Sequence, residues 1–207
     1  MARLPSLRVE AGQAALILGP SGAGKTTLLL AIAGLVDAYG GSIQIDGVEL
    51  TTLSAAKRDR FRGGNIGLVF QDIHLIPGLS ALDNVLLSPY AAGLRQDREM
   101  AMILLDRLGL KDKANRPAQT LSRGQAQRAA IARAMLLRPK LILADEPTAS
   151  LDDEACQVVG DLLISAAEQS GAALLISTHD QRLKARVSQT VAAEPIFPPS
   201  QVREASA

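Results

Sequence analysis

The stretch Gly19 to Thr27 constrains the fold of this chain more than any other part of its sequence, and it reads GPSGAGKTT. It holds the pattern G-x-x-x-x-G-K-T, a phosphate-binding loop that needs a strand before it and a helix after it. The apolar run AALIL before it predicts a strand buried on both faces, and TLLLAIA after it predicts the helix. The alternative is a glycine-rich turn with an unrelated lysine. The four specified positions arise by chance in about one chain of this length per hundred, and the flanking segments disfavour that alternative further.

The residue types of the loop fit a polyphosphate ligand. Gly19, Gly22 and Gly24 let backbone N–H groups turn inward where a Cβ would collide. The following helix points its positive N-terminal end at the same anion. Lys25 is expected to reach the β- and γ-phosphates, and Thr26 to offer its hydroxyl to Mg²⁺. We therefore predict a nucleotide-binding loop made of Gly19, Pro20, Ser21, Gly22, Ala23, Gly24, Lys25, Thr26 and Thr27.

Buried strands recur along the rest of the chain. They are predicted at Ile66 to Phe70, Leu141 to Ala144 and Ala172 to Ser177, with a further candidate at Leu7 to Val9. SIQI at 42–45, followed by an Asp-Gly turn, predicts a hairpin.

Helical segments separate these strands. They are predicted at 53–62, 82–87, 98–108, 124–137 and 153–169. Strands that alternate with helices predict an α/β fold with a mostly parallel sheet, as in P-loop NTPases. Residues 72–137 look like a mostly helical insertion. We expect one domain over 1–194 and a loose tail over 195–207.

Composition limits the class of protein. The chain has 207 residues, of which 47% are hydrophobic and only 2% aromatic, so an aliphatic core is expected. A net charge of +1 gives no support for nucleic-acid binding, and the single cysteine fits a reducing compartment. No apolar run approaches the ~18 residues of a membrane span. These features predict an intracellular protein whose membrane role, if any, comes through a partner.

The segment LILADE is a predicted strand that ends in two acids, Asp145 and Glu146. The carboxyl end of a strand is where an open α/β sheet places its ligands. Asp145 is placed to hold Mg²⁺, and Glu146 to accept a proton from an attacking water. Two acids that merely cap a helix are the alternative, which the nearby phosphate loop disfavours.

Further motifs follow a family order: Gln71 after a strand, LSRGQ at 121–125, Ser150-Leu151-Asp152, and His179 after a strand. With GPSGAGKTT and LILADE they span most of the chain, which resembles the ATPase subunit of ATP-binding-cassette (ABC) transporters. The resemblance implies ATP and Mg²⁺ as cofactors.

The resemblance also assigns roles to individual residues. It implies that catalysis rests on Glu146, His179, Gln71 and Lys25, and that Mg²⁺ contacts Thr26, Gln71 and Asp145. It implies that Ser122, Gly124 and Gln125 bind the nucleotide held by an opposite subunit, with Asp152 between the two sites. His74 matches no motif and is interpreted as a surface or packing residue.

A narrower resemblance rests on NIGLVFQ at 65–71, HLIP at 74–77 and ALDNV at 81–85. These segments look like the branch of lipoprotein-release, macrolide-efflux and cell-division ATPases. The resemblance implies a head-to-tail dimer with a second copy or a homologous subunit, and a membrane permease partner at the inner face of the cell membrane. We expect the permease to dock at 71–84, where Ile73, Leu75, Ile76 and Leu79 form either an exposed patch or ordinary core.

The chain departs from the family pattern in two ways. Arg123 stands where the signature motif usually has glycine, and we expect its side chain to point away from the γ-phosphate. The family stacks adenine on an upstream aromatic ring, but the first aromatic here is Tyr39, so weak base discrimination is expected. The antiparallel part is shortened at the N-terminus, and a strand or so after His179 is also expected to be missing.

Two alternatives to the transporter subunit remain. One is a soluble ABC-type ATPase switch, which usually carries two cassettes or long insertions. The other is a regulatory subunit that binds ATP without hydrolysing it, which Glu146 and His179 disfavour.

Overall fold

The computed structural model describes residues 2–149 and 153–195. The predicted contact residue Asp152 and residues 196–207 of the predicted loose tail lie outside these ranges. Pro195, which was assigned to that tail, belongs to a strand. Among the described residues, no helix is both long and apolar enough to cross a bilayer.

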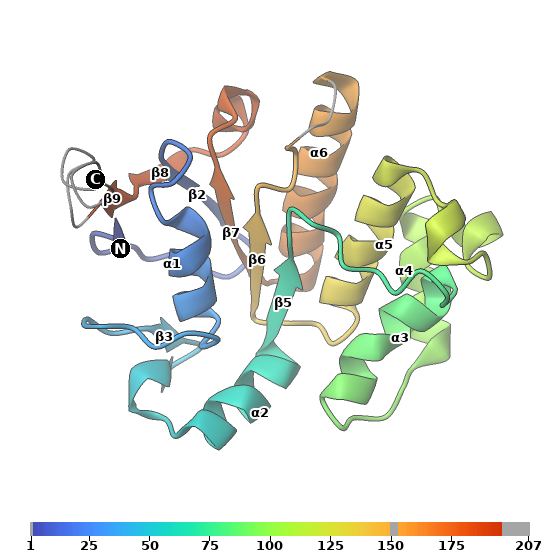
Figure 1. Ribbon diagram of the computed structural model, residues 1–207, viewed down its shortest axis with the longest axis horizontal. Coiled ribbons are helices and arrows are strands. Elements are labelled where there is room, and N and C mark those ends of the chain that lie inside the picture. The colour runs from blue at the N-terminus through green and yellow to red at the C-terminus, as the bar shows by residue number, and fades with distance from the viewer. Residues whose placement is uncertain (1, 150–152, 196–207) are drawn as a thin grey trace, which may run out of the picture.

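A five-stranded parallel sheet forms the centre of the molecule (Figure 1). Its order is β5-β6-β7-β2-β8, so the carboxyl ends of all its strands lie along one edge. The four predicted strands are confirmed to within one or two residues. The fifth, β8, was not predicted, because its four residues QTVA lack a clear apolar pattern. The strands are β2 (Ala14–Leu18), β5 (Ile66–Val69), β6 (Leu141–Asp145), β7 (Ala173–Thr178) and β8 (Gln189–Ala192).

Alternate side chains of each strand enter two separate aliphatic cores. Leu16, Ile142 and Ile176 lie in the core on one face. Their neighbours Ile17 and Leu143 lie in the core on the other face. Because successive strand residues point to opposite faces, a strand covered on both sides must be apolar throughout. This explains the continuous runs AALIL and LILA.

Helices cover both faces of the sheet (Figure 1). One face packs on α1 (Lys25–Ile32), whose Leu29 is buried in that core. The other face packs on α5 (Arg123–Met135) and α6 (Asp153–Ser170). The sheet and α1 thus hold the phosphate loop, which lies between β2 and α1, at the carboxyl edge.

Three helices lie between β5 and β6, as the sequence predicted: α3 (Ala81–Ala91), α4 (Arg98–Arg107) and α5. In Figure 1 they form the right-hand part of the molecule. The helix α5 passes so close to β5 that a Cβ on Gly67 would lie 2.4 Å from the carbonyl oxygen of Ala134. Only glycine allows this approach.

Short elements complete the chain. The predicted hairpin is β3 (Gln44–Ile45) and β4 (Val48–Glu49), and α2 (Ala55–Asn65) starts two residues later than expected. The strands β1 (Ala2–Arg3) and β9 (Glu194–Pro195) pair in an antiparallel two-stranded sheet. Single 3₁₀ turns occupy Leu50–Thr52, Lys111–Lys113, Ala118–Thr120 and Gln181–Ala185.

The candidate strand at Leu7 to Val9 is wrong, because residues 7–9 pair with no strand. Leu7 and Val9 are instead half-buried against the core beneath α1. Their alternating apolar pattern reflects packing without a backbone ladder. Two strands, β8 and β9, follow His179 in the described part of the chain.

Candidate active site

The phosphate loop connects the end of β2 to the start of α1, and two of its glycines adopt left-handed backbone angles. Gly24 caps α1 with φ 83°, and Gly22 has φ 80°. A Cβ on Gly24 would also lie 2.7 Å from the Cβ of Ala2. Both conformation and space therefore require glycine at position 24.

The ammonium group of Lys25 is folded back into the loop. Its Nζ donates hydrogen bonds to the carbonyl oxygens of Gly19 (2.9 Å) and Pro20 (3.2 Å). The same Nζ lies 3.1 Å from Oε1 of Glu146. The Lys25 side chain is only 6% exposed, so this is a nearly buried charge surrounded by acceptors.

Glu146 follows β6 directly and brings a second chain segment to Lys25. Its backbone is left-handed, with φ 43°, and its N–H donates to the carbonyl oxygen of Ser177 at 2.9 Å. A non-glycine residue in that region costs on the order of 1–3 kcal/mol and occurs where surrounding structure enforces it. Here the enforced turn points a carboxylate, 10% exposed, toward the phosphate loop.

His179 follows β7 and contacts the same carboxylate. Its ring Nδ1 lies 3.0 Å from Oε1 of Glu146, and its backbone N–H donates to Oε2 at 3.4 Å. The ring is 57% exposed, so it spans from the buried carboxylate toward solvent. The Glu146 carboxylate therefore contacts Lys25 next to the phosphate loop and His179 in the loop that follows β7, called the β7 loop below.

The pKa of Glu146 is lowered from its ordinary value. Burial raises this pKa, but the hydrogen bonds from His179 and Lys25 and the charge of Lys25 outweigh the burial. The carboxyl group is therefore ionised at neutral pH.

Asp145, the last residue of β6, is oriented by the neighbouring strand. Its Oδ1 accepts a hydrogen bond from the hydroxyl of Ser177. Both side chains are buried, at 7% and 0% exposure, at the carboxyl edge of the sheet. The sequence reading missed Ser177, although a polar residue near the end of a predicted buried strand was the available signal.

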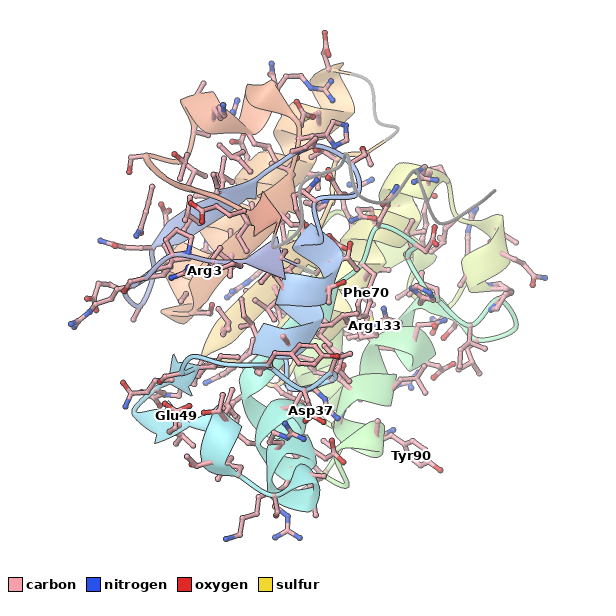
Figure 2. All side chains as sticks on the ribbon, turned by 60° about the vertical axis from the view of Figure 1, so that its left-hand side comes forward. Arg3, Asp37, Glu49, Phe70, Tyr90 and Arg133 are labelled. Carbon is pink, nitrogen blue, oxygen red and sulfur yellow. The ribbon has the colours of Figure 1, made fainter. Side chains whose placement is uncertain are left out.

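Gln71 is exposed and lies in the loop after β5, two residues beyond the last strand residue. Two side chains hold this loop, the half-buried Arg133 and the fully buried Asn84. The guanidinium of Arg133 on α5 donates to the carbonyl oxygens of His74 (2.7 Å) and Ile73 (3.0 Å). The amide of Asn84 on α3 both donates to and accepts from the backbone of Ile76. Figure 2 labels Arg133, which comes from α5, and Phe70, which directly follows β5.

Of the apolar residues expected on that loop, only Ile76 is exposed, at 47%. Ile73, Leu75 and Leu79 are half-buried, and Leu75 packs against the larger core. The alternative of ordinary core packing therefore holds for Leu75, and Ile76 carries the exposed apolar surface.

The residues of the signature motif lie at the start of α5. Ser122 caps the helix and accepts from the N–H of Gln125 at 3.3 Å, while the Gln125 side chain accepts from the N–H of Ser122 at 3.0 Å. This capping box satisfies two backbone N–H groups at the start of α5, and that end of the helix lies at the surface. Arg123 is exposed in that turn. In Figure 1, α5 lies on the other side of β5 and β6 from α1.

The structure thus brings together Lys25, Glu146 and His179, with Asp145 one residue away from Glu146. It does not bring Ser122, Gly124 or Gln125 to the same phosphate loop within one chain. The roles of Ser122, Gly124 and Gln125 in binding a partner's nucleotide stay predictions. Asp152 lies outside the described residues.

Comparison with known proteins gives a consistent result. A sequence model of the family described as "ABC transporter" matches residues 3–149. The lipoprotein-releasing system ATP-binding protein LolD 2 of Rhodospirillum rubrum is 44% identical over 188 residues, covering 89% of this chain and 81% of that protein. LolD 1 of Caulobacter vibrioides is 44% identical over 183 residues, covering 87% of this chain and 78% of that protein.

Solved structures show the same architecture. The ATP-binding cassette MJ0796, a dimer in a post-hydrolysis state bound to ADP and Pi, superposes with a TM-score of 0.80 at 34% identity, covering 91% of this chain and 84% of that one. CbiO1 of Clostridium perfringens, part of the ABC transporter complex cbiONQ, gives a TM-score of 0.79 at 27% identity and covers 91% and 76%. The predicted fold class and family are confirmed, and the chain belongs to the ABC transporter family as an ATP-binding ATPase subunit.

Proposed function

We propose that this chain hydrolyses Mg·ATP at the phosphate loop with Glu146 as the general base. The observation that carries the proposal is the contact of one buried carboxylate with both Lys25 and His179. The phosphate loop binds the nucleotide, and the three side chains converge where its terminal phosphate belongs.

The residues present fit a magnesium ion. Mg²⁺ prefers oxygen ligands and keeps several waters, so a single carboxylate and a hydroxyl suffice from the protein. Asp145 supplies a carboxylate whose orientation Ser177 fixes, and Thr26 supplies an exposed hydroxyl in the first turn of α1. Gln71 offers an amide oxygen from the loop after β5. When bound, the ion would neutralise charge on the β- and γ-phosphates.

The protein groups supply proton transfer and positioning. Glu146 is ionised because its pKa is lowered, so its carboxylate can accept a proton from a water that attacks the γ-phosphate. The His179 ring, held at 3.0 Å from that carboxylate, orients it toward the water. Lys25 presents its charge to the transferred phosphoryl group.

A second copy of the chain would complete the site. Ser122 and Gly124 stand at the exposed N-terminal end of α5, whose positive dipole suits a phosphate. This end lies apart from the chain's own phosphate loop (Figure 1). A head-to-tail pair would place it over the partner's nucleotide, in agreement with the dimeric state of the MJ0796 cassette.

We further propose that the dimer drives a membrane permease of the lipoprotein-releasing type at the inner face of the cell membrane. The support is the similarity to two LolD proteins and the well-held loop at 71–84 with Ile76 exposed on it. Arg133 and Asn84 fix the backbone of that loop, as a docking surface requires.

This coupling is tested by the ATPase activity of the chain with and without its detergent-solubilised permease. We expect the permease to stimulate turnover, and Ile76→Asp to remove the stimulation while basal turnover stays within twofold. Val158→Asp on α6 is the matched control, because Val158 is 46% exposed and Ile76 is 47% exposed. Equal stimulation of both variants would contradict docking at this loop. No permease association of the wild type, with normal turnover, would favour a soluble switch.

A further inference from the structure

Asp180, the residue after His179, ties together the two loops that carry the proposed catalytic groups. Its carboxylate accepts hydrogen bonds from the hydroxyl of Thr148 (3.1 Å) and the thiol of Cys156 (3.3 Å). Thr148 lies two residues after Glu146, and Cys156 lies in α6. The Asp180 side chain is 13% exposed, so one nearly buried carboxylate links the β6 loop, the β7 loop and α6.

Arg182 fixes that carboxylate from the solvent side. Its Nε lies 2.9 Å and 3.0 Å from the two oxygens of Asp180, and a terminal nitrogen lies 2.6 Å from Oδ2. The other terminal nitrogen donates to Asp153, the first residue of α6. The guanidinium of Arg182 therefore links Asp180, the residue beside His179, to the first residue of α6.

We propose that Arg182 and Asp180 are positioning residues, which hold the His179 loop against the Glu146 loop so that the imidazole and the carboxylate stay in contact. This inference rests on the proposed roles of Glu146 and His179. Asp180 and Arg182 bond to each other, and they reach Thr148, Cys156 and Asp153. Their action is through the backbone of the β7 loop and through Thr148.

The chemistry of the pair suits this role. A guanidinium offers a planar fork that fixes a carboxylate in orientation as well as position, which a lysine ammonium cannot do. Arg182 lowers the pKa of Asp180 below its ordinary range, although burial opposes the change. Asp180 thus stays charged and continues to accept from Thr148 and Cys156.

Simple surface stabilisation is the competing explanation. Asp153 is 87% exposed, and an exposed ion pair contributes little to folding. A neighbouring pair makes a suitable control: Arg186 also pairs with an α6 carboxylate, Asp161, without touching Asp180. Arg186→Met therefore removes a comparable link between the same segments and leaves the positioning contacts in place.

The test compares Arg182→Met, Arg182→Lys and Arg186→Met with the wild type. For Arg182→Met we expect kcat to fall at least fivefold and KM for ATP to change less than twofold, because the contact between Glu146 and His179 loosens while the phosphate loop is untouched. Arg182→Lys should recover only part of kcat. Arg186→Met should stay within twofold of wild type in both constants.

A structural readout separates this inference from the proposed catalytic roles. The sequence contains only two histidines, so the imidazole resonances of His179 and His74 can be followed by NMR. Arg182→Met should shift or broaden the His179 resonances and leave those of His74 unchanged, whether or not the chain turns over ATP. The positioning role is overturned if Arg182→Met and Arg186→Met give the same His179 spectrum and the same kcat. Wild-type protein without turnover, but with the expected spectra, would contradict the catalytic assignment alone.

Discussion

The carboxylate of Glu146 lies 3.0 Å from the imidazole Nδ1 of His179, although the two residues are 33 positions apart in the chain. The contact exists because β6 and β7 are parallel neighbours, with Asp145 paired to Ser177 in register. Each catalytic candidate is the first or second residue beyond that pair. Adjacent parallel strands thus deliver two functional groups to one point from distant parts of the sequence.

The lowered pKa of Glu146 predicts a pH-dependent contribution to folding. A carboxyl group whose pKa is lower in the folded state stabilises the fold above its unfolded-state pKa of about 4.3. This contribution is lost as the pH falls through the lowered folded-state pKa. We expect the difference in free energy of unfolding between wild type and Glu146→Gln, measured by urea denaturation, to shrink as the pH falls below about 5. A difference independent of pH over that window would show that Lys25 and His179 do not stabilise the charged form.

Gly24→Ala tests the shape of the phosphate loop. A left-handed backbone at 83° and a Cβ only 2.7 Å from that of Ala2 both oppose the substitution. We expect a loss of about 1–3 kcal/mol in stability and at least a tenfold loss in ATP affinity, measured by calorimetry. Gly93→Ala is the matched control, because Gly93 has φ 67° but open space around it. It should lose stability without losing ATP affinity, and parallel losses in both variants would contradict the assignment.

Asn84→Ala tests what holds the loop after Gln71. The side chain is fully buried, accepts from the N–H of Ile76 at 2.7 Å and donates to three carbonyl oxygens. Removing this side chain leaves the Ile76 N–H without its acceptor, so we expect the free energy of unfolding to fall by about 3 kcal/mol, measured by urea denaturation. Asn65→Ala removes one hydrogen bond, to Phe61, and should cost about 1 kcal/mol. Equal losses would mean that Asn84 does not organise the loop.

Base selectivity provides a further prediction. No aromatic residue precedes Tyr39 in the sequence, and stacking on an aromatic ring is worth about 1–3 kcal/mol per base. We expect ATP and GTP to bind within about tenfold of each other, a gap of about 1.4 kcal/mol. Competition between the two nucleotides for a fluorescent ATP analogue measures this ratio. A stronger preference for ATP would show that another group holds adenine.

Much of the fold follows from short-range patterns in the sequence. Continuous apolar runs identified β2, β5, β6 and β7, because strands covered on both faces need no polar residues. The strand β8 was missed because its side chains are partly exposed, so its pattern is weak. Leu7 and Val9 gave a strand-like alternation from packing alone.

The candidate site was predictable in its motif residues and not in its supporting contacts. Lys25, Glu146 and His179 carry motifs, and the structure brings them together. Ser177, Thr148 and Asp180 make their contacts between chain segments that are distant in sequence. Arg182 is an example of a contact that sequence patterns do not predict, because no motif near it indicates that its side chain reaches the start of α6.

The most direct test of the account is steady-state ATPase activity of the purified chain, beside Glu146→Gln. Removing a general base typically costs two to four orders of magnitude in rate. We predict Mg-dependent turnover in the wild type, its loss by at least a hundredfold in Glu146→Gln, and an ATP-stabilised dimer of that variant by light scattering. Turnover of Glu146→Gln within tenfold of wild type would contradict the assignment of Glu146 as the catalytic base.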